Sequence, residues 1–187
     1  MKEKVLNDLI EFTNQRIVSN LDELSISKDL IKATCFINLS AEKKIMNILY
    51  LKNRINTINQ LKGKSNFSEI QKVISRVCKL AESGNLKTTI FSYKYYVNPD
   101  LFEKQCENKV FEFINELEEI IKLSNWDYFQ LFKLFEANSN NLNELFDNER
   151  GVLMMADNPE IRNNRLNLLG LVRNYSLKIA DFTLFNS

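Results

Sequence analysis

The residues best suited to bind a charged ligand are two arginines near the C-terminal end of the chain, Arg162 and Arg165. They lie three positions apart in a segment with helical periodicity, so both side chains share one face of the predicted helix. Arginine makes planar, two-pronged contacts to phosphate or to a base edge, and Asn164 between them can donate and accept hydrogen bonds. The spacing therefore predicts nucleic-acid contacts by Arg162, Asn164 and Arg165. The alternative is that these arginines pair with carboxylates and fix their helix in a bundle.

A second candidate contact lies earlier, where aromatic and basic residues are interleaved between Gly84 and Pro99. Exposed aromatic rings can stack on unpaired bases, and nearby lysines can hold phosphates. Lys87, Lys94 and Tyr95 are the predicted contacts. The alternative is ordinary hydrophobic cover for a helix pair, which would bury the aromatic residues of the segment: Phe91, Tyr93, Tyr95 and Tyr96.

The composition argues against an active site. The chain has no histidine, and so lacks the commonest general base and zinc ligand. No phosphate-binding, dinucleotide-binding, metalloprotease or hydrolase motif occurs. The neighbouring carboxylates Glu118 and Glu119 lie in an acidic helical segment, where a solvated face is a better explanation than an acid–base pair. We expect no catalysis by this chain on its own, no cofactor and no metal.

The cysteines and the hydropathy pattern point to a reducing cytoplasm. Cys35, Cys78 and Cys106 are odd in number, far apart and each inside an apolar helical pattern, which excludes a disulfide framework and a CxxC metal pair. The first four residues alternate in charge, and no run of 18 apolar residues follows. The sequence therefore predicts no targeting segment and no membrane contact.

The net charge of +1 hides a strong polarity along the chain. Residues 1–99 carry 16 Lys and Arg against 9 Asp and Glu, a net +7; residues 100–149 carry 4 against 12, a net −8; residues 150–187 carry 5 against 3, a net +2. Two basic regions separated by an acidic block could attract a polyanion at two places. Solvated helix faces with opposite local charge would give the same pattern.

Apolar residues at helical spacing, with only 4 Gly and 2 Pro, predict an all-α fold, a bundle of seven to eight helices in two small packed subdomains. Ser68 with Gln71 reads as a capping box and Gly84 as the residue that ends that helix. A stretch of extended character at 84–98 would divide the chain into residues 1–83 and 99–187. Residues 137–143 are expected to form a loop. The predicted helices span residues 2–17, 27–37, 40–62, 68–83, 99–123, 125–136 and 159–180.

The C-terminal motifs resemble a known family. The sequence reads FDN at residues 146–148, VLMMADNPEIRNNRLNLL at 152–169 and IADF at 179–182. This is similar to the DALR-type anticodon-binding domain that ends the β subunit of tetrameric bacterial glycyl-tRNA synthetase. The spacing Arg162-x-Asn164-Arg165-Leu166-x-Leu168-Leu169 matches the family pattern without a gap. SRV at 75–77 and NPDLFE at 98–103 also resemble it.

The resemblance implies a non-catalytic part of an aminoacyl-tRNA synthetase. Residues 99–187 would be the anticodon-binding domain for tRNA-Gly, with Arg162, Asn164 and Arg165 facing the anticodon loop. Residues 1–83 would grip the tRNA body, which suits their positive charge. The partner in catalysis would be the α subunit, which holds the aminoacylating site of the family.

The chain departs from the family pattern by what reads as an insertion at residues 149–151, by a single Phe146 where two Phe are usual, and by Cys78 after Arg-Val. The insertion bears on the geometry of the loop before the last helix. Two alternatives stay open: a helical protein-interaction or assembly module with no RNA binding, and the anticodon-binding domain of another synthetase such as arginyl-tRNA synthetase.

Overall fold

The computed structural model describes residues 2–23, 26–35 and 48–185. Within these ranges the chain forms eight α-helices and two short 3-10 helices, and no strand. The predicted all-α class and the number of helices are therefore confirmed. The predicted helix ends near Ile37 and Ser40 lie outside the described residues.

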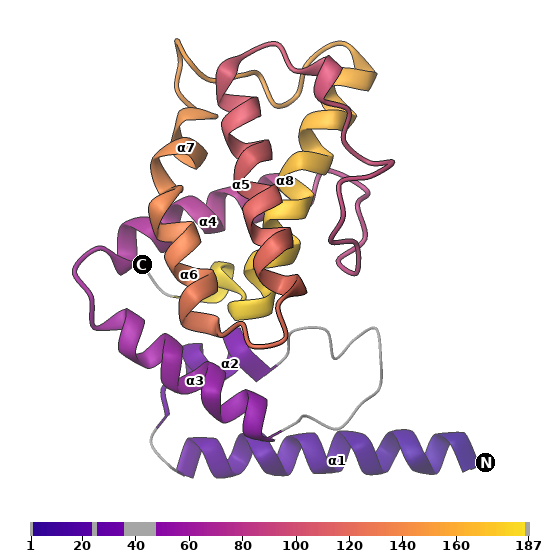
Figure 1. The fold of residues 1–187 in the computed structure, drawn as a ribbon. Coiled ribbons are helices and arrows are strands. Elements are labelled where there is room, and N and C mark those ends of the chain that lie inside the picture. The colour runs from indigo at the N-terminus through magenta and orange to yellow at the C-terminus, as the bar shows by residue number, and fades with distance from the viewer. Residues whose placement is uncertain (1, 24–25, 36–47, 186–187) are drawn as a thin grey trace.

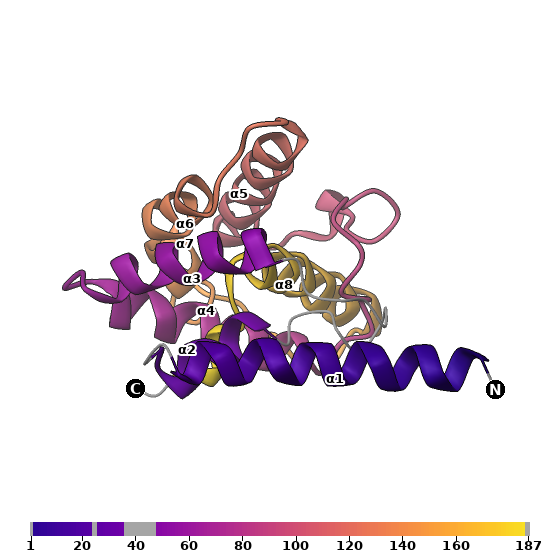
Figure 2. The ribbon, with the colours of Figure 1, turned by 90° about the horizontal axis from the view of Figure 1, so that it is seen from below.

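Three helices form the base of the molecule (Figure 1). The long α1 (Lys2–Glu23) runs across the bottom, and α2 (Lys28–Cys35) and α3 (Ile48–Lys62) lie above it. In Figure 2 the N-terminal half of α1 extends past the other helices. The apolar spacing correctly predicts this helix, but the side chains of Val5, Leu9 and Phe12 are exposed.

The remaining helices build the main body above this base. The central α4 (Phe67–Ala81) packs along α8 (Pro159–Ile179), and the short helix η2 (Phe182–Leu184) returns from α8 onto α4 and α2. The acidic α5 (Gln105–Lys122) lies beside α8, and α6 (Tyr128–Ala137) and α7 (Ser139–Glu144) lie beside α5. The body is therefore a bundle of helices packed around α8.

Aromatic rings fill the point where the base meets the body. Phe67, Phe132 and Phe182 pack with ring centroids 5.8–6.4 Å apart, and Phe185 closes the group. The backbone N–H of Asp181 donates to the Ala33 carbonyl of α2 at 2.8 Å. The C-terminal turn therefore links the first and last parts of the described chain. The division at 84–98 stays a prediction, but one cluster of buried residues extends across it.

Two predictions about the ends of α4 are wrong. Asn66, not Ser68, precedes the helix, and the predicted capping box is wrong because the buried Gln71 amide donates to the Phe182 carbonyl at 3.0 Å. The helix ends at Glu82 rather than at a left-handed Gly84. A tertiary hydrogen bond to the C-terminal turn has overridden the local pattern.

Three other boundaries differ from the prediction. Pro99 opens only the short helix η1 (Pro99–Leu101), and α5 starts afterwards at Gln105. The helix predicted from residue 125 begins at Tyr128 instead, because the Asp127 side chain caps α6: it accepts from the Gln130 backbone N–H, and the Gln130 side chain accepts from the Asp127 N–H. The predicted loop at 137–143 is mostly the helix α7. In α3, Ile55 and Ile58 are buried, whereas Leu49 is exposed.

No helix among the described residues is long and apolar enough to cross a membrane.

The reactivity of the three cysteine thiols provides a test of this packing. Each side chain is buried, and burial raises the pKa of all three thiols, to about 11 for Cys78. Because the thiolate is the reactive form, we expect a colorimetric disulfide reagent to label the folded chain slowly and the urea-unfolded chain at all three positions. Rapid labelling of the folded chain would contradict the packing around α2, α4 and α5.

Candidate nucleic-acid interface

The segment at residues 84–98, called the aromatic loop from here on, leaves α4 and passes over one side of α8 (Figure 1). It contains turns and no helix. Its two lysines are not balanced by any Asp or Glu. This basic and aromatic composition makes its exposed side the leading candidate for a polyanion contact.

The first half of the aromatic loop is held by polar side chains of α8. The Asn174 amide donates to the carbonyls of Lys87 and Ile90 at 2.8 and 2.6 Å, and the Arg173 guanidinium donates to the Leu86 carbonyl at 2.6 Å. Gly170 lets the loop approach: a Cβ there would lie 2.9 Å from the Leu86 side chain. The backbone of the loop is therefore fixed by α8 although it has no regular structure.

The second half of the aromatic loop is held in the same way. The Asn164 side chain accepts from the Asn98 N–H at 2.7 Å and donates to the Asn98 carbonyl at 3.0 Å. Asn167 donates to the Tyr96 carbonyl at 2.7 Å. Each such bond contributes roughly 0.5–1.5 kcal/mol net. Asn164, predicted to contact nucleic acid, is buried and positions the loop.

Two aromatic residues of the loop face inward. The Phe91 ring packs edge-on against Tyr175, with centroids 5.4 Å apart, and Tyr93 packs against Phe111 at 4.8 Å. The Tyr175 hydroxyl also donates to the Phe91 carbonyl. For Phe91 and Tyr93, hydrophobic cover is therefore the role that the contacts support.

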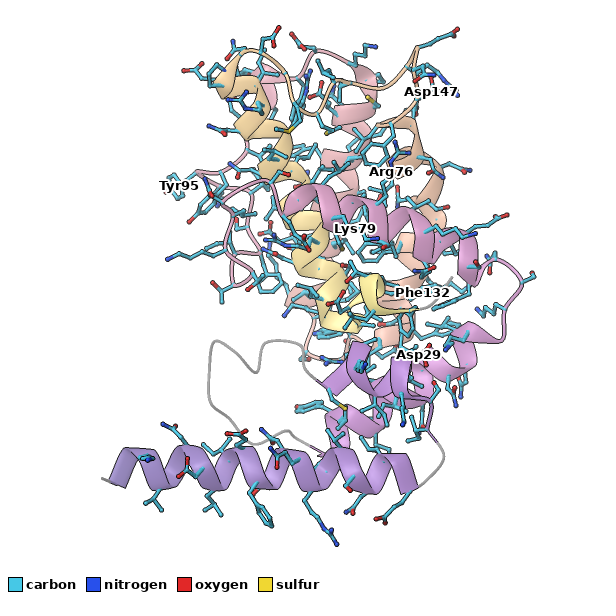
Figure 3. The ribbon with its side chains drawn as sticks, turned by 180° about the vertical axis from the view of Figure 1, so that it is seen from behind. Asp29, Arg76, Lys79, Tyr95, Phe132 and Asp147 are labelled. Atoms are coloured by element: carbon cyan, nitrogen blue, oxygen red, sulfur yellow. The ribbon has the colours of Figure 1, made fainter. Side chains whose placement is uncertain are left out.

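The other candidate residues of the loop face solvent. Lys87, Lys94 and Tyr96 are exposed, and the Tyr95 side chain is fully exposed. Figure 3 shows Tyr95 at the edge of the molecule, pointing away from the helices. Tyr95 also has a φ of 70°, in the left-handed region that non-glycine residues rarely adopt, at a cost of roughly 1–2 kcal/mol. The structure thus brings Lys94 and Tyr95 together at an exposed turn.

Arg165 lies inside the protein. Only 3% of its side chain is exposed, and its Nε donates to Glu107 at 2.9 Å. The other guanidinium nitrogens donate to the Leu153 carbonyl, at 2.9 Å, and to the Glu103 carboxylate. Burial opposes the charged guanidinium, but hydrogen bonds to Glu107 and Glu103 raise the pKa of Arg165 overall. The ion-pair alternative for Arg165, with the acidic block as partner, is what the geometry supports.

Glu107, the main partner of Arg165, is fully buried in the first turn of α5. Its second carboxylate oxygen accepts from the backbone N–H groups of Glu103 and Lys104, at 2.8 and 3.0 Å. One carboxylate therefore caps α5 and neutralises the arginine of α8. Removing either charge would leave the other buried without compensation.

Arg162 lies at the surface edge of the same helix. It is half-buried, and its guanidinium donates to the Ala156 carbonyl at 3.3 Å. Its neighbour Asn163 is exposed. Of the three residues in the predicted motif, only Arg162 can still reach a ligand.

The tight turn before α8 explains the apparent insertion at 149–151. The Asp147 side chain accepts from the backbone N–H groups of Glu149 and Arg150, at 3.0 and 2.9 Å. At Gly151 a Cβ would lie 2.5 Å from two backbone carbonyl oxygens. The extra residues thus form a compact turn that is stabilised by its own hydrogen bonds.

Comparison with known proteins supports the resemblance. The chain is 31% identical over 185 residues to the glycine–tRNA ligase beta subunit of Picosynechococcus sp., covering 97% of this chain and 26% of the relative. The corresponding proteins of Gloeothece citriformis and Acaryochloris marina are 30% and 28% identical, over 97% and 95% of this chain and 26% and 25% of theirs.

The chain is similar to glycine–tRNA ligase beta subunits over almost all its residues. It spans about a quarter of the length of these relatives. No family model matches the chain. The similarity therefore covers nearly all of the chain, while the assignment of a DALR-type domain rests on the motif residues.

Apart from Asn164, the sequence pattern did not single out the residues that hold the aromatic loop. Asn167, Gly170 and Asn174 lie on α8 at spacings of three and four, a helical stripe that faces the loop. This stripe of small and amide side chains could have predicted that α8 holds the backbone of a neighbouring segment. Among the described residues no group of His, Cys, Asp and Glu is arranged to hold a metal ion.

The buried ion pair gives a prediction about stability. Replacing Arg165 by Met keeps most of its volume but leaves Glu107 buried and unpaired, so we expect a loss of roughly 3–5 kcal/mol in urea unfolding. The matched control is Arg162→Met, which removes one long hydrogen bond at a half-exposed position and should cost less than about 1 kcal/mol. Equal effects of the two substitutions would contradict the structural role of Arg165.

Proposed function

We propose that this chain is a tRNA-binding part of a glycine–tRNA ligase beta subunit, which holds tRNA-Gly while the α subunit catalyses aminoacylation. The observation that carries the proposal is the similarity to named beta subunits over 97% of the chain. The proposed contacts are Lys87, Lys94 and Tyr95 of the aromatic loop, with Arg162 at the start of α8. Asn164 and Arg165 position these elements rather than touch RNA.

The geometry of the aromatic loop supports this assignment. A fully exposed tyrosine in a strained backbone conformation, held by a scaffold of side-chain hydrogen bonds, is a feature that stability alone does not favour. Tyr95 can stack on an unpaired base of a tRNA loop, as single-stranded RNA recognition generally requires. Lys94 precedes Tyr95 directly and Lys87 is exposed in the first half of the loop, so both can neutralise phosphates of a bound RNA.

The position of the loop on α8 supports a rigid contact. Five residues of α8, from Asn164 to Tyr175, donate hydrogen bonds to the loop. A loop fixed before binding loses little conformational freedom when RNA docks, so more of the stacking energy appears as affinity. The helix α8, which carries the family-like motif, would thus contribute to RNA binding by holding the aromatic loop in place.

A tRNA-binding measurement on two loop variants tests the proposal. Tyr95→Gly removes the ring and relieves the left-handed backbone, so its stability should stay within about 1 kcal/mol of the parent, whereas affinity for tRNA-Gly should fall roughly five- to a hundred-fold. Lys94→Ala should lower the slope of log affinity against log salt by roughly 0.7–0.9. Fluorescence anisotropy with labelled tRNA-Gly transcript measures both.

The matched controls are Leu123→Ala, which removes an exposed apolar side chain after α5, and Lys122→Ala, which removes an exposed charge at the end of α5. Neither should change affinity or its salt dependence. Absence of salt-sensitive tRNA binding by the parent chain would favour the assembly alternative. Binding that Tyr95→Gly and Lys94→Ala leave unchanged would exclude the aromatic loop as the contact.

A further inference from the structure

A second surface with the chemistry of a base-binding site lies away from the aromatic loop. A groove of about 540 Å³ runs between α3 and the N-terminal end of α6, which lie next to each other at the lower part of the body (Figure 1). Its volume falls within the roughly 300–1,000 Å³ of small-ligand sites. The aromatic loop, in contrast, lies beside α8.

One wall of the groove is a row of amides on α3. Asn53, Asn56 and Gln60 occur at spacings of three and four, so they share one helix face, and all three are exposed and line the groove. No described residue hydrogen-bonds to these side-chain amides. Each amide offers a donor and an acceptor, the groups that read the edge of a base.

The opposite wall is aromatic. Trp126, Tyr128 and Phe129 line it at the start of α6, with the Trp126 and Tyr128 rings in an edge-to-face contact at 5.5 Å. The Phe129 ring is partly exposed although large and apolar. A planar ligand that enters the groove would meet both these aromatic side chains and the amides of α3.

Cations surround these rings. The Arg54 guanidinium lies 5.3 Å from the Tyr128 ring centroid, and the ammonium groups of Lys64 and Lys133 lie 4.7 and 5.7 Å from that of Phe129. Between residues 48 and 68 the sequence has four Lys or Arg and no Asp or Glu. Lys133 is ion-paired with Glu136. Arg54 and Lys64 therefore supply the positive charge beside the rings that a phosphate backbone needs.

We propose that the groove between α3 and α6 binds one unpaired base of single-stranded RNA, stacked on the aromatic wall and hydrogen-bonded to the amides of Asn53, Asn56 and Gln60. The proposal extends the tRNA-binding function proposed above to a second contact. The combination of rings, amides and flanking cations fits a nucleotide better than an apolar peptide segment, which would leave the amides unpaired.

One carboxylate in the groove sets a preference among bases. Asp127 is exposed there and lines the groove, and one of its oxygens already accepts from the Gln130 N–H. Its remaining acceptor capacity suits the exocyclic amino group of cytosine, which uracil lacks. We therefore expect cytosine to bind more tightly than uracil.

Trp126 is the single tryptophan of the chain, so its fluorescence reports on the groove directly. Titration of the chain with short oligocytidylate at low salt should quench this fluorescence saturably, and oligouridylate should bind at least several-fold more weakly. Free N-acetyltryptophanamide, titrated in parallel, corrects for light absorbed by the RNA. Equal affinity for the two oligonucleotides would overturn the role given to Asp127.

A double variant tests the amides. Asn53→Ala with Gln60→Ala changes only exposed side chains and should weaken oligocytidylate binding at least ten-fold, with the unfolding midpoint unchanged. Asn59→Ala is the matched control, because Asn59 is an exposed amide of α3 that does not line the groove. It should leave the titration unchanged.

The outcomes separate this proposal from the tRNA-binding function. If tRNA-Gly binds but neither quenches Trp126 nor responds to the double variant, the groove is not an RNA site, and the function proposed for the aromatic loop still stands. The opposite result is that oligocytidylate quenches Trp126, the double variant abolishes the quenching, and tRNA-Gly does not bind. This would support the groove as an RNA-binding site and exclude the proposed tRNA-binding function. No quenching by any RNA overturns the groove proposal.

Discussion

The buried ion pair between Arg165 and Glu107 constrains most of the upper body. It joins the first turn of α5 to the first half of α8, and the same carboxylate caps α5 through two backbone N–H groups. A buried charge pair is tolerated only when nearly every polar atom is satisfied. The register of α8 against α5 is therefore fixed, and with it the face of α8 that meets the aromatic loop.

That register decides which residues can reach a ligand. With Arg165 turned toward α5, Asn164, Asn167 and Asn174 face the loop and hold its backbone. The exposed turn of Lys94 and Tyr95 is the consequence. The motif of α8, which the sequence predicts to contact RNA, supports the exposed aromatic loop in the folded chain.

The sequence predicted the helical architecture well because apolar periodicity survives almost any tertiary context. The predicted helices at 2–17, 27–37 and 159–180 begin within one residue of the starts of α1, α2 and α8. It failed where distant parts of the chain compete for local polar groups, as when Gln71 bonds to Phe182 instead of capping its own helix.

The candidate site was predicted only in part, for the same reason. Basic and aromatic residues at 87–96 identified the exposed loop, but not which rings point inward. Tyr93 packs on Phe111 because α5 lies next to the loop. The sequence of the loop alone does not predict the position of α5. The groove between α3 and α6 is lined by residues more than 60 positions apart in the sequence. No pattern within either segment predicts that the two come together.

We expect RNA to contact the aromatic loop and not the buried side chains of Asn164 and Arg165. Ultraviolet cross-linking of the chain to tRNA-Gly, followed by mass spectrometry of the linked peptides, can test this. The expected cross-links lie at Tyr95 or Tyr96, with Trp126 as the second position. Cross-links confined to α1 or to the turn at 145–157, with none in the aromatic loop, would contradict it.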